Sequence, residues 1–74
     1  MKTTLASRAR RLLAMAERAK INTESHLTIM SPHADNPQIK EVCERKQGYV
    51  EMLDAVIAAL NGDFTLMSIY TNEN

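Results

Sequence analysis

Apolar residues recur with a helical period along the first 30 residues of the chain. Leu5, Leu12 and Ala19 lie seven residues apart with Met15 between them, which is the spacing of one face of an α-helix. Either Thr3 or Thr4 can act as the N-cap, since a hydroxyl at that position accepts a hydrogen bond from the first turn. The pattern predicts a helix over about residues 3–30, whose stripe continues through Asn22, His26 and Ile29.

A second helical stripe follows the stretch SPHADNP (residues 31–37), whose two prolines, Asp and Asn interrupt the first pattern. Asn36 before Pro37 is typical of a helix start, and Asn61 before Gly62 is typical of a helix end. The second helix is therefore expected over residues 37–61. Its stripe comprises Ile39, Cys43, Lys46, Val50, Leu53, Ile57 and Leu60, and Val42, Tyr49 and Val56 widen it on one flank.

The two predicted helices have similar lengths, roughly 40 and 37 Å at about 1.5 Å per residue. Two such helices joined by a short loop favour an antiparallel hairpin, with LTIM (residues 27–30) as the end of the first helix rather than a strand. Pairing the helices about the centre of the loop places Ala19 opposite Gly48. A glycine costs a helix roughly 1 kcal/mol relative to alanine, so Gly48 is expected to permit the close approach of another helix.

The C-terminal segment Phe64–Tyr70 is apolar, and two structures remain open for it. Asp63 could cap a short helix, whereas Phe64, Leu66 and Ser68 alternate as they would in a strand. In either case its apolar side chains are expected to cover the open end of the hairpin or to enter a subunit interface. Residues 71–74 are expected to form a disordered tail.

The small size of the chain indicates self-association. Its 74 residues form a single small helical domain, and a chain of this length buries only about 60% of its unfolded surface. Cys43 is the only cysteine, so an intramolecular disulfide cannot supply extra stability. We therefore expect an all-α hairpin that assembles into a homodimer or a higher even-numbered helical bundle. The expected interface residues are Leu5, Leu12, Met15, Val50, Leu53, Ile57, Leu60, Phe64 and Leu66.

Charge is unevenly distributed, although the net charge is zero. Residues 1–22 carry six basic and one acidic side chain, and residues 23–74 carry three basic and eight acidic ones. This asymmetry has two interpretations. The basic helix pairs with the acidic one, within the hairpin or between subunits, or its arginines bind an acidic protein surface or the phosphates of a nucleic acid or nucleotide. The candidate arginines are Arg8, Arg10, Arg11 and Arg18.

A second group of polar residues is predicted near the loop, where the pairing brings Asn22, His26, Arg45 and Lys46 together. Such a polar layer can fix the register and the number of subunits, or it can bind a small anion. His26, His33, Asp35 and Cys43 do not show the spacing of a zinc site. We therefore expect no catalytic residues, no metal and no cofactor.

These observations predict a small non-enzymatic protein-interaction module, an inhibitor, adaptor or regulator of the kind that bacteria and phages encode. Its partners would be further copies of itself and another protein. The alternative is nucleic-acid or nucleotide binding through the arginine-rich first helix. No apolar run approaches the roughly 18 residues of a membrane span, so a cytoplasmic protein without a membrane partner is expected.

Overall fold

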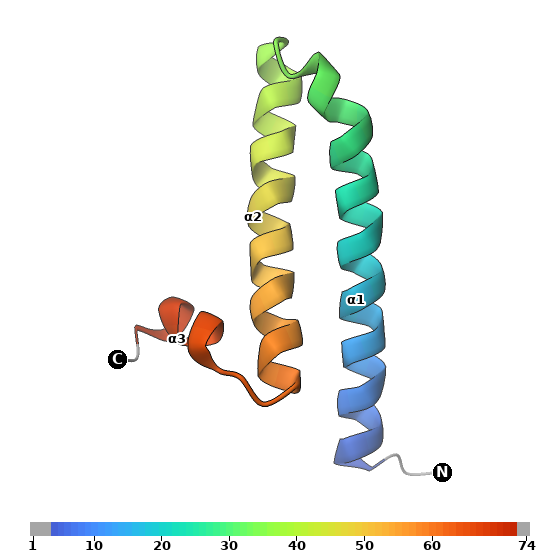
Figure 1. The fold of residues 1–74 in the computed structure, drawn as a ribbon, viewed down its shortest axis with the longest axis vertical. Coiled ribbons are helices and arrows are strands. Elements are labelled where there is room, and N and C mark those ends of the chain that lie inside the picture. Colours follow the sequence, from blue (N-terminus) through green and yellow to red (C-terminus); the bar gives the residue numbers. More distant parts are fainter. Residues whose placement is uncertain (1–3, 73–74) are drawn as a thin grey trace.

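The computed structural model describes residues 4–72, which form an antiparallel helical hairpin with a third, short helix beside it (Figure 1). The elements are α1 (Leu5–Met30), a 3₁₀ turn η1 (Ser31–His33), α2 (Pro37–Leu60) and α3 (Thr65–Thr71). Residues 4–72 contain no strand. The predicted all-α hairpin is thus confirmed.

Local sequence determines where α1 begins and ends. The Thr4 hydroxyl accepts a hydrogen bond from the Ser7 N–H at 3.0 Å, so Thr4 is the N-cap; Thr3 lies outside the described residues. The stretch LTIM ends α1 as predicted, and the chain continues into η1, where Pro32 lacks an N–H for an α-helical bond.

The boundaries of α2 are those predicted, within one residue. The Asn36 side chain accepts a hydrogen bond from the Gln38 N–H at 2.9 Å, and Pro37 occupies the first turn. At the other end Gly62 has φ +97°, and the Asp63 N–H donates to the Ala58 carbonyl at 2.8 Å. This is a Schellman termination, in which glycine supplies the left-handed residue.

The C-terminal segment is a helix, which decides between the two structures that the sequence leaves open. The Asp63 carboxylate accepts a hydrogen bond from the Thr65 N–H at 3.0 Å. This bond, together with one from the Thr65 side chain, lowers the pKa of Asp63 below its ordinary value of 3.8. Thr71 closes α3, and Asn72 follows with φ +59°. The rest of the expected tail, residues 73–74, lies outside the described residues.

The molecule is a layer one helix thick, with extents of 47 × 35 × 15 Å. Its radius of gyration is 15.2 Å, whereas a compact domain of this length has about 11 Å. The exposed area is 6024 Å², compared with about 4,600 Å² for a typical monomer of this mass. Few side chains are buried, namely Ala16, Thr23, Cys43, Leu53 and Ala55.

The residues of α2 that face the hairpin interior are the predicted ones. All seven residues of its stripe, from Ile39 to Leu60, are buried or half-buried. On α1 the prediction is wrong, because the row that faces α2 is displaced from the predicted stripe by one residue, which is about 100° around the helix. The row that faces α2 comprises Ala9, Leu13, Ala16, Lys20, Thr23, Leu27 and Met30.

The predicted α1 stripe stays outside because α1 carries two adjacent rows with the same period. Leu5, Leu12 and Met15 are 78%, 49% and 59% exposed. The inner row contains alanines at positions 9 and 16, which leave room for the larger side chains of α2. The outer row has the larger apolar side chains, so the sequence alone favours it as the packed face. Steric fit against α2 selects the inner row instead.

The alignment of the two helices also differs from the prediction. Lys20 Nζ lies 2.5 Å from Asp54 Oδ1, whereas pairing about the loop centre places Lys20 opposite Gln47, which lies about 10 Å nearer the turn than Asp54. Part of the shift arises because η1 continues the rise of α1 before the chain turns, and the long Lys20 side chain spans the rest. The expected role of Gly48 within the hairpin is wrong as well, since a Cβ atom there would meet no atom within 4 Å.

Candidate protein-interaction surface

The outer row of α1, which contains Leu5, Leu12 and Met15, and one flank of α2 lie on the same broad side of the layer. In an antiparallel helix pair, the residues that flank the contact rows in the same heptad position lie on the same side of both helices. Such equivalent positions are occupied by the outer row of α1 and by the flank of α2 that contains Val42 and Tyr49. We define the apolar face as Leu12, Met15 and Ala19 of α1 with Tyr49, Met52 and Val56 of α2.

Large apolar side chains on this side of the layer are strongly exposed. Leu12 is 49% exposed, Met15 59%, Tyr49 52% and Met52 37%. Leu5 and Ile29 extend the α1 row toward the two ends of the helix. Soluble monomers rarely expose contiguous apolar patches of this kind, so the apolar face is a candidate contact surface.

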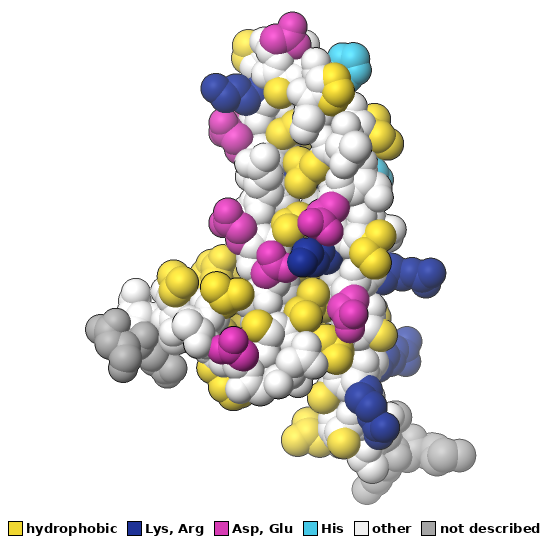
Figure 2. All heavy atoms as spheres, in the orientation of Figure 1, with side chains coloured by type: hydrophobic (Ala, Val, Ile, Leu, Met, Phe, Trp, Pro, Cys, Tyr) yellow, Lys and Arg dark blue, Asp and Glu magenta, His cyan; other side chains and the backbone are white. Residues whose placement is uncertain are grey.

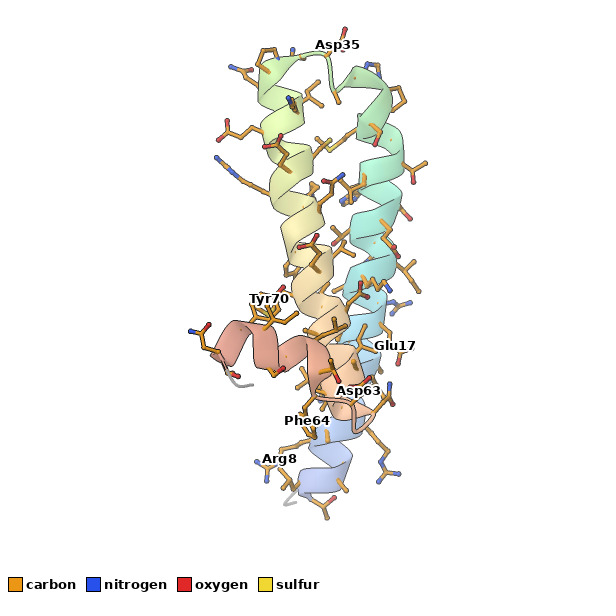
Figure 3. The ribbon with its side chains drawn as sticks, turned by 60° about the vertical axis from the view of Figure 1, so that its left-hand side comes forward. Arg8, Glu17, Asp35, Asp63, Phe64 and Tyr70 are labelled. Carbon is orange, nitrogen blue, oxygen red and sulfur yellow. The ribbon has the colours of Figure 1, made fainter. Side chains whose placement is uncertain are left out.

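The opposite broad face is charged. It carries Glu17, Lys20 and Glu24 of α1 and Asp54 of α2, and Figure 2 shows acidic side chains over both helices on this side. The Lys20–Asp54 hydrogen bond and charge raise the pKa of Lys20 above 10.5. Figure 3 shows Arg8 and Glu17 leaving α1 on opposite sides. Figure 2 also shows hydrophobic side chains on this face, so it differs from the apolar face by its charged residues rather than by a lack of apolar ones.

The four candidate arginines do not form a single patch within one copy. Arg8, Arg10, Arg11 and Arg18 are all exposed. In residues 4–72 the basic first helix pairs with α2 through Lys20 and Asp54, but neither of the two ion pairs found there involves these arginines. From the helical period, Arg8 lies toward the apolar face, Arg10 toward the charged face, and Arg11 and Arg18 along the outer edge of α1.

The predicted polar layer is not inside the hairpin. Asn22, His26 and Arg45 are exposed, and Arg45 pairs with Glu41 of its own helix at 2.5 Å. By their helical positions these three residues extend the side of the apolar face toward the turn, and Lys46 is half-buried in the α2 stripe. Whether they fix a register or bind an anion stays a prediction.

The polar group inside the hairpin is one that the sequence does not single out. Thr23 is only 7% exposed, and its hydroxyl donates to the Ala19 carbonyl at 2.8 Å. This bond within α1 satisfies the hydroxyl without any partner on α2. The signal that could have identified Thr23 is its place in the row of α1 that faces α2.

The remaining expected interface residues divide between interior and surface. Leu53 is buried, and Val50, Ile57 and Leu60 are half-buried between α1 and α2, so they contribute to the hairpin itself. Phe64 and Leu66 are 64% and 43% exposed near α3.

Packing of α3 on α2 creates a shallow cleft of about 290 Å³, lined by Glu51, Asp54, Leu66, Ile69 and Tyr70. Tyr70 projects from α3 beside α2 (Figure 3). No local sequence signal indicates this cleft, because the position of α3 depends on tertiary packing. The cleft adds apolar surface to the edge of the layer opposite the arginines Arg11 and Arg18.

The lone thiol has the buried position that its place in the α2 stripe predicts, since Cys43 is 6% exposed. Within residues 4–72, no three His, Cys, Asp or Glu side chains are grouped as a metal site would require. The helices of this part of the chain include none with the length and apolarity needed to cross a membrane.

Comparisons of the chain with protein-family models, with curated protein sequences and with solved structures give no match.

Proposed function

We propose that this chain is a non-enzymatic protein-interaction module that works as a homo-oligomeric helical bundle. Its role would be that of a cytoplasmic inhibitor, adaptor or regulator, whose assembled surface binds another protein. The observation that carries the proposal is the apolar face, where Leu12, Met15 and Tyr49 are each about half exposed or more on one side of a single helix layer.

Surface area supports association. The exposed area exceeds that of a typical monomer of this mass by about 1,400 Å². A standard protein interface covers roughly 800 Å² on each partner. One such interface on the apolar face would bring the exposed area much closer to the usual value, and it would give the hairpin the second layer that most domains possess.

Nucleic-acid or nucleotide binding is the second candidate. The observation in its favour is that all four arginines are exposed and that none takes part in the ion pairs of residues 4–72. Against it, they point to three sides of α1. An oligomer could gather arginines from several copies into one basic surface, so this function too would depend on assembly.

Charge introduced into the apolar face tests the proposal. Met15 and Ile21 are similarly exposed, at 59% and 63%, but they lie on different sides of α1. Sedimentation equilibrium is expected to show an oligomer for the unmodified chain and for Ile21→Lys, and a monomer for Met15→Lys. An unmodified chain that sediments as a monomer at all accessible concentrations would refute the proposal.

A further inference from the structure

We infer that the apolar face seats a second copy of this chain related by a two-fold axis parallel to the helices, so that α1 of each copy packs against α2 of the other. This inference rests on the proposed homo-oligomer and specifies its geometry and the residues that meet. The product is a four-helix bundle in which every neighbouring pair of helices is antiparallel.

Two two-fold arrangements can bring the apolar faces together. With the axis parallel to the helices, α1 lies against the partner's α2. With the axis perpendicular to the helices and in the plane of the layer, α1 lies against the partner's α1, and α2 against the partner's α2. Both bury the same side chains, so hydrophobic burial alone does not choose between them.

Charge favours the first arrangement. The half of α1 at the open end of the hairpin carries Arg8, Arg10, Arg11 and Arg18 against Glu17, whereas the half of α2 at the same end carries Glu51 and Asp54 and no basic residue. An axis parallel to the helices makes these halves, which have opposite net charge, neighbours in the bundle, although Arg8 is the one named charge on the side of the apolar face and the others lie on the charged face or the outer edges. The perpendicular axis instead places the arginine-rich half of α1 against the partner's α1, which has no compensating excess of acid.

The most exposed apolar residues at the open end also fit the first arrangement. Leu5 is 78% exposed in the first turn of α1, and Phe64 is 64% exposed directly after the end of α2. In the view of Figure 3, Phe64 lies on the same side of α1 as Arg8, away from Glu17. An axis parallel to the helices keeps both open ends together, so that Phe64 of each copy can cover the first turn of the other copy's α1.

The alignment of the helices identifies a pair of positions that should meet. Because η1 continues α1 to His33 before α2 begins at Pro37, residues at equal distances from these two ends lie at about the same level. Leu12 lies 21 residues before His33 and Ala59 lies 22 residues after Pro37, so the two are nearly level, and both lie on the side of the apolar face. In the proposed dimer Leu12 of one copy therefore lies close to Ala59 of the other.

Engineered cysteines test this geometry. Leu12→Cys and Ala59→Cys are each made in a Cys43→Ala chain, since the natural thiol is the only other cysteine. After the two variants are mixed, equilibrated and oxidised with glutathione disulfide, the mixture is expected to form a disulfide-linked heterodimer. Each variant alone, and Cys43→Ala as the background control, is expected to remain largely uncrosslinked.

The outcomes separate this inference from the proposed function. Efficient crosslinking of Leu12→Cys with itself would indicate α1 against α1 and would overturn the arrangement. A mixture that sediments as a dimer but forms no heterodimeric disulfide would overturn it as well, while leaving the homo-oligomer in place.

A second pair of variants covers the case in which the smaller side chain at position 12 weakens the dimer too far. In that case the Cys43→Ala control sediments as a dimer and the unoxidised mixture sediments as a monomer. Met15→Cys mixed with Val56→Cys, each in the Cys43→Ala chain, must then give the heterodimer, because Met15 and Val56 lie at about the same level. Failure of this pair to crosslink would overturn the arrangement.

Discussion

Replacement of Leu12 by alanine is the perturbation whose effect on assembly can be worked out most directly. Leu12 is 49% exposed in a single copy. Moving a fully exposed leucine side chain into an apolar environment contributes about 1.5–3 kcal/mol, so the half that is still exposed can contribute about 0.75–1.5 kcal/mol when a second copy covers it. A dimer contains two such sites, and the loss is about 1.5–3 kcal/mol of association free energy.

That loss corresponds to an increase of about 10- to 150-fold in the dimer dissociation constant. Ile21→Ala is the matched control, since Ile21 is 63% exposed on a different side of α1. It should change the dissociation constant by less than about twofold, because surface substitutions are usually within about 0.5 kcal/mol. Sedimentation equilibrium over a range of concentrations measures both constants.

Equal effects of Leu12→Ala and Ile21→Ala on the dissociation constant would refute a contact of Leu12 between copies. That contact is also refuted if Leu12→Ala leaves the dissociation constant unchanged but lowers the melting temperature at concentrations where the chain is monomeric. That result would mean that Leu12 packs inside the hairpin rather than between copies.

Two further predictions concern the single copy. Leu53 is 8% exposed between α1 and α2, so Leu53→Ala should cost about 2–5 kcal/mol and lower the melting temperature followed by circular dichroism by at least about 8 °C; a shift below about 2 °C would contradict the described interior. The pKa of Asp63 is lowered by its bonds to Thr65, so this carboxylate stabilises the start of α3 above its ordinary pKa of 3.8 and loses the effect as pH falls through the lowered value. The Thr65 amide resonance should therefore titrate with a midpoint below 3.8, and a midpoint at or above that value would show that the cap is not formed.

The helix boundaries could be predicted from sequence because each depends on local chemistry. Thr4, Asn36 and Gly62 act through hydrogen bonds or backbone angles within a few residues of themselves. The α2 stripe is predictable for a similar reason, since only one face of that helix combines a helical period with mostly large apolar side chains.

The inner row of α1 could not be chosen in the same way. Two neighbouring rows share one period, and the row with the larger apolar residues is the outer one. The choice depends on how closely α1 and α2 approach, which is a property of both helices together. The position of α3, and with it the cleft beside Glu51 and Tyr70, likewise depends on tertiary packing rather than on any local signal.

The mispredicted row is also what identifies the candidate surface. Leu5, Leu12 and Met15 have the spacing of a packed helix face but lie outside the hairpin. The sequence predicts them at a subunit interface, and their exposure in the single copy is compatible with that prediction. Polar positions further along the same row, at Asn22 and His26, would limit the apolar contact to the open-end half of the hairpin.

A native mass spectrum of the purified, untagged chain tests the central claim most directly. The expected result is an even multiple of the 8.3 kDa chain mass, beginning with the dimer and without adducts. Additional mass matching a nucleotide or an oligonucleotide would favour the arginine-dependent function instead. A bare monomer at every accessible concentration would contradict the account, since the apolar face would then have no second copy to cover it.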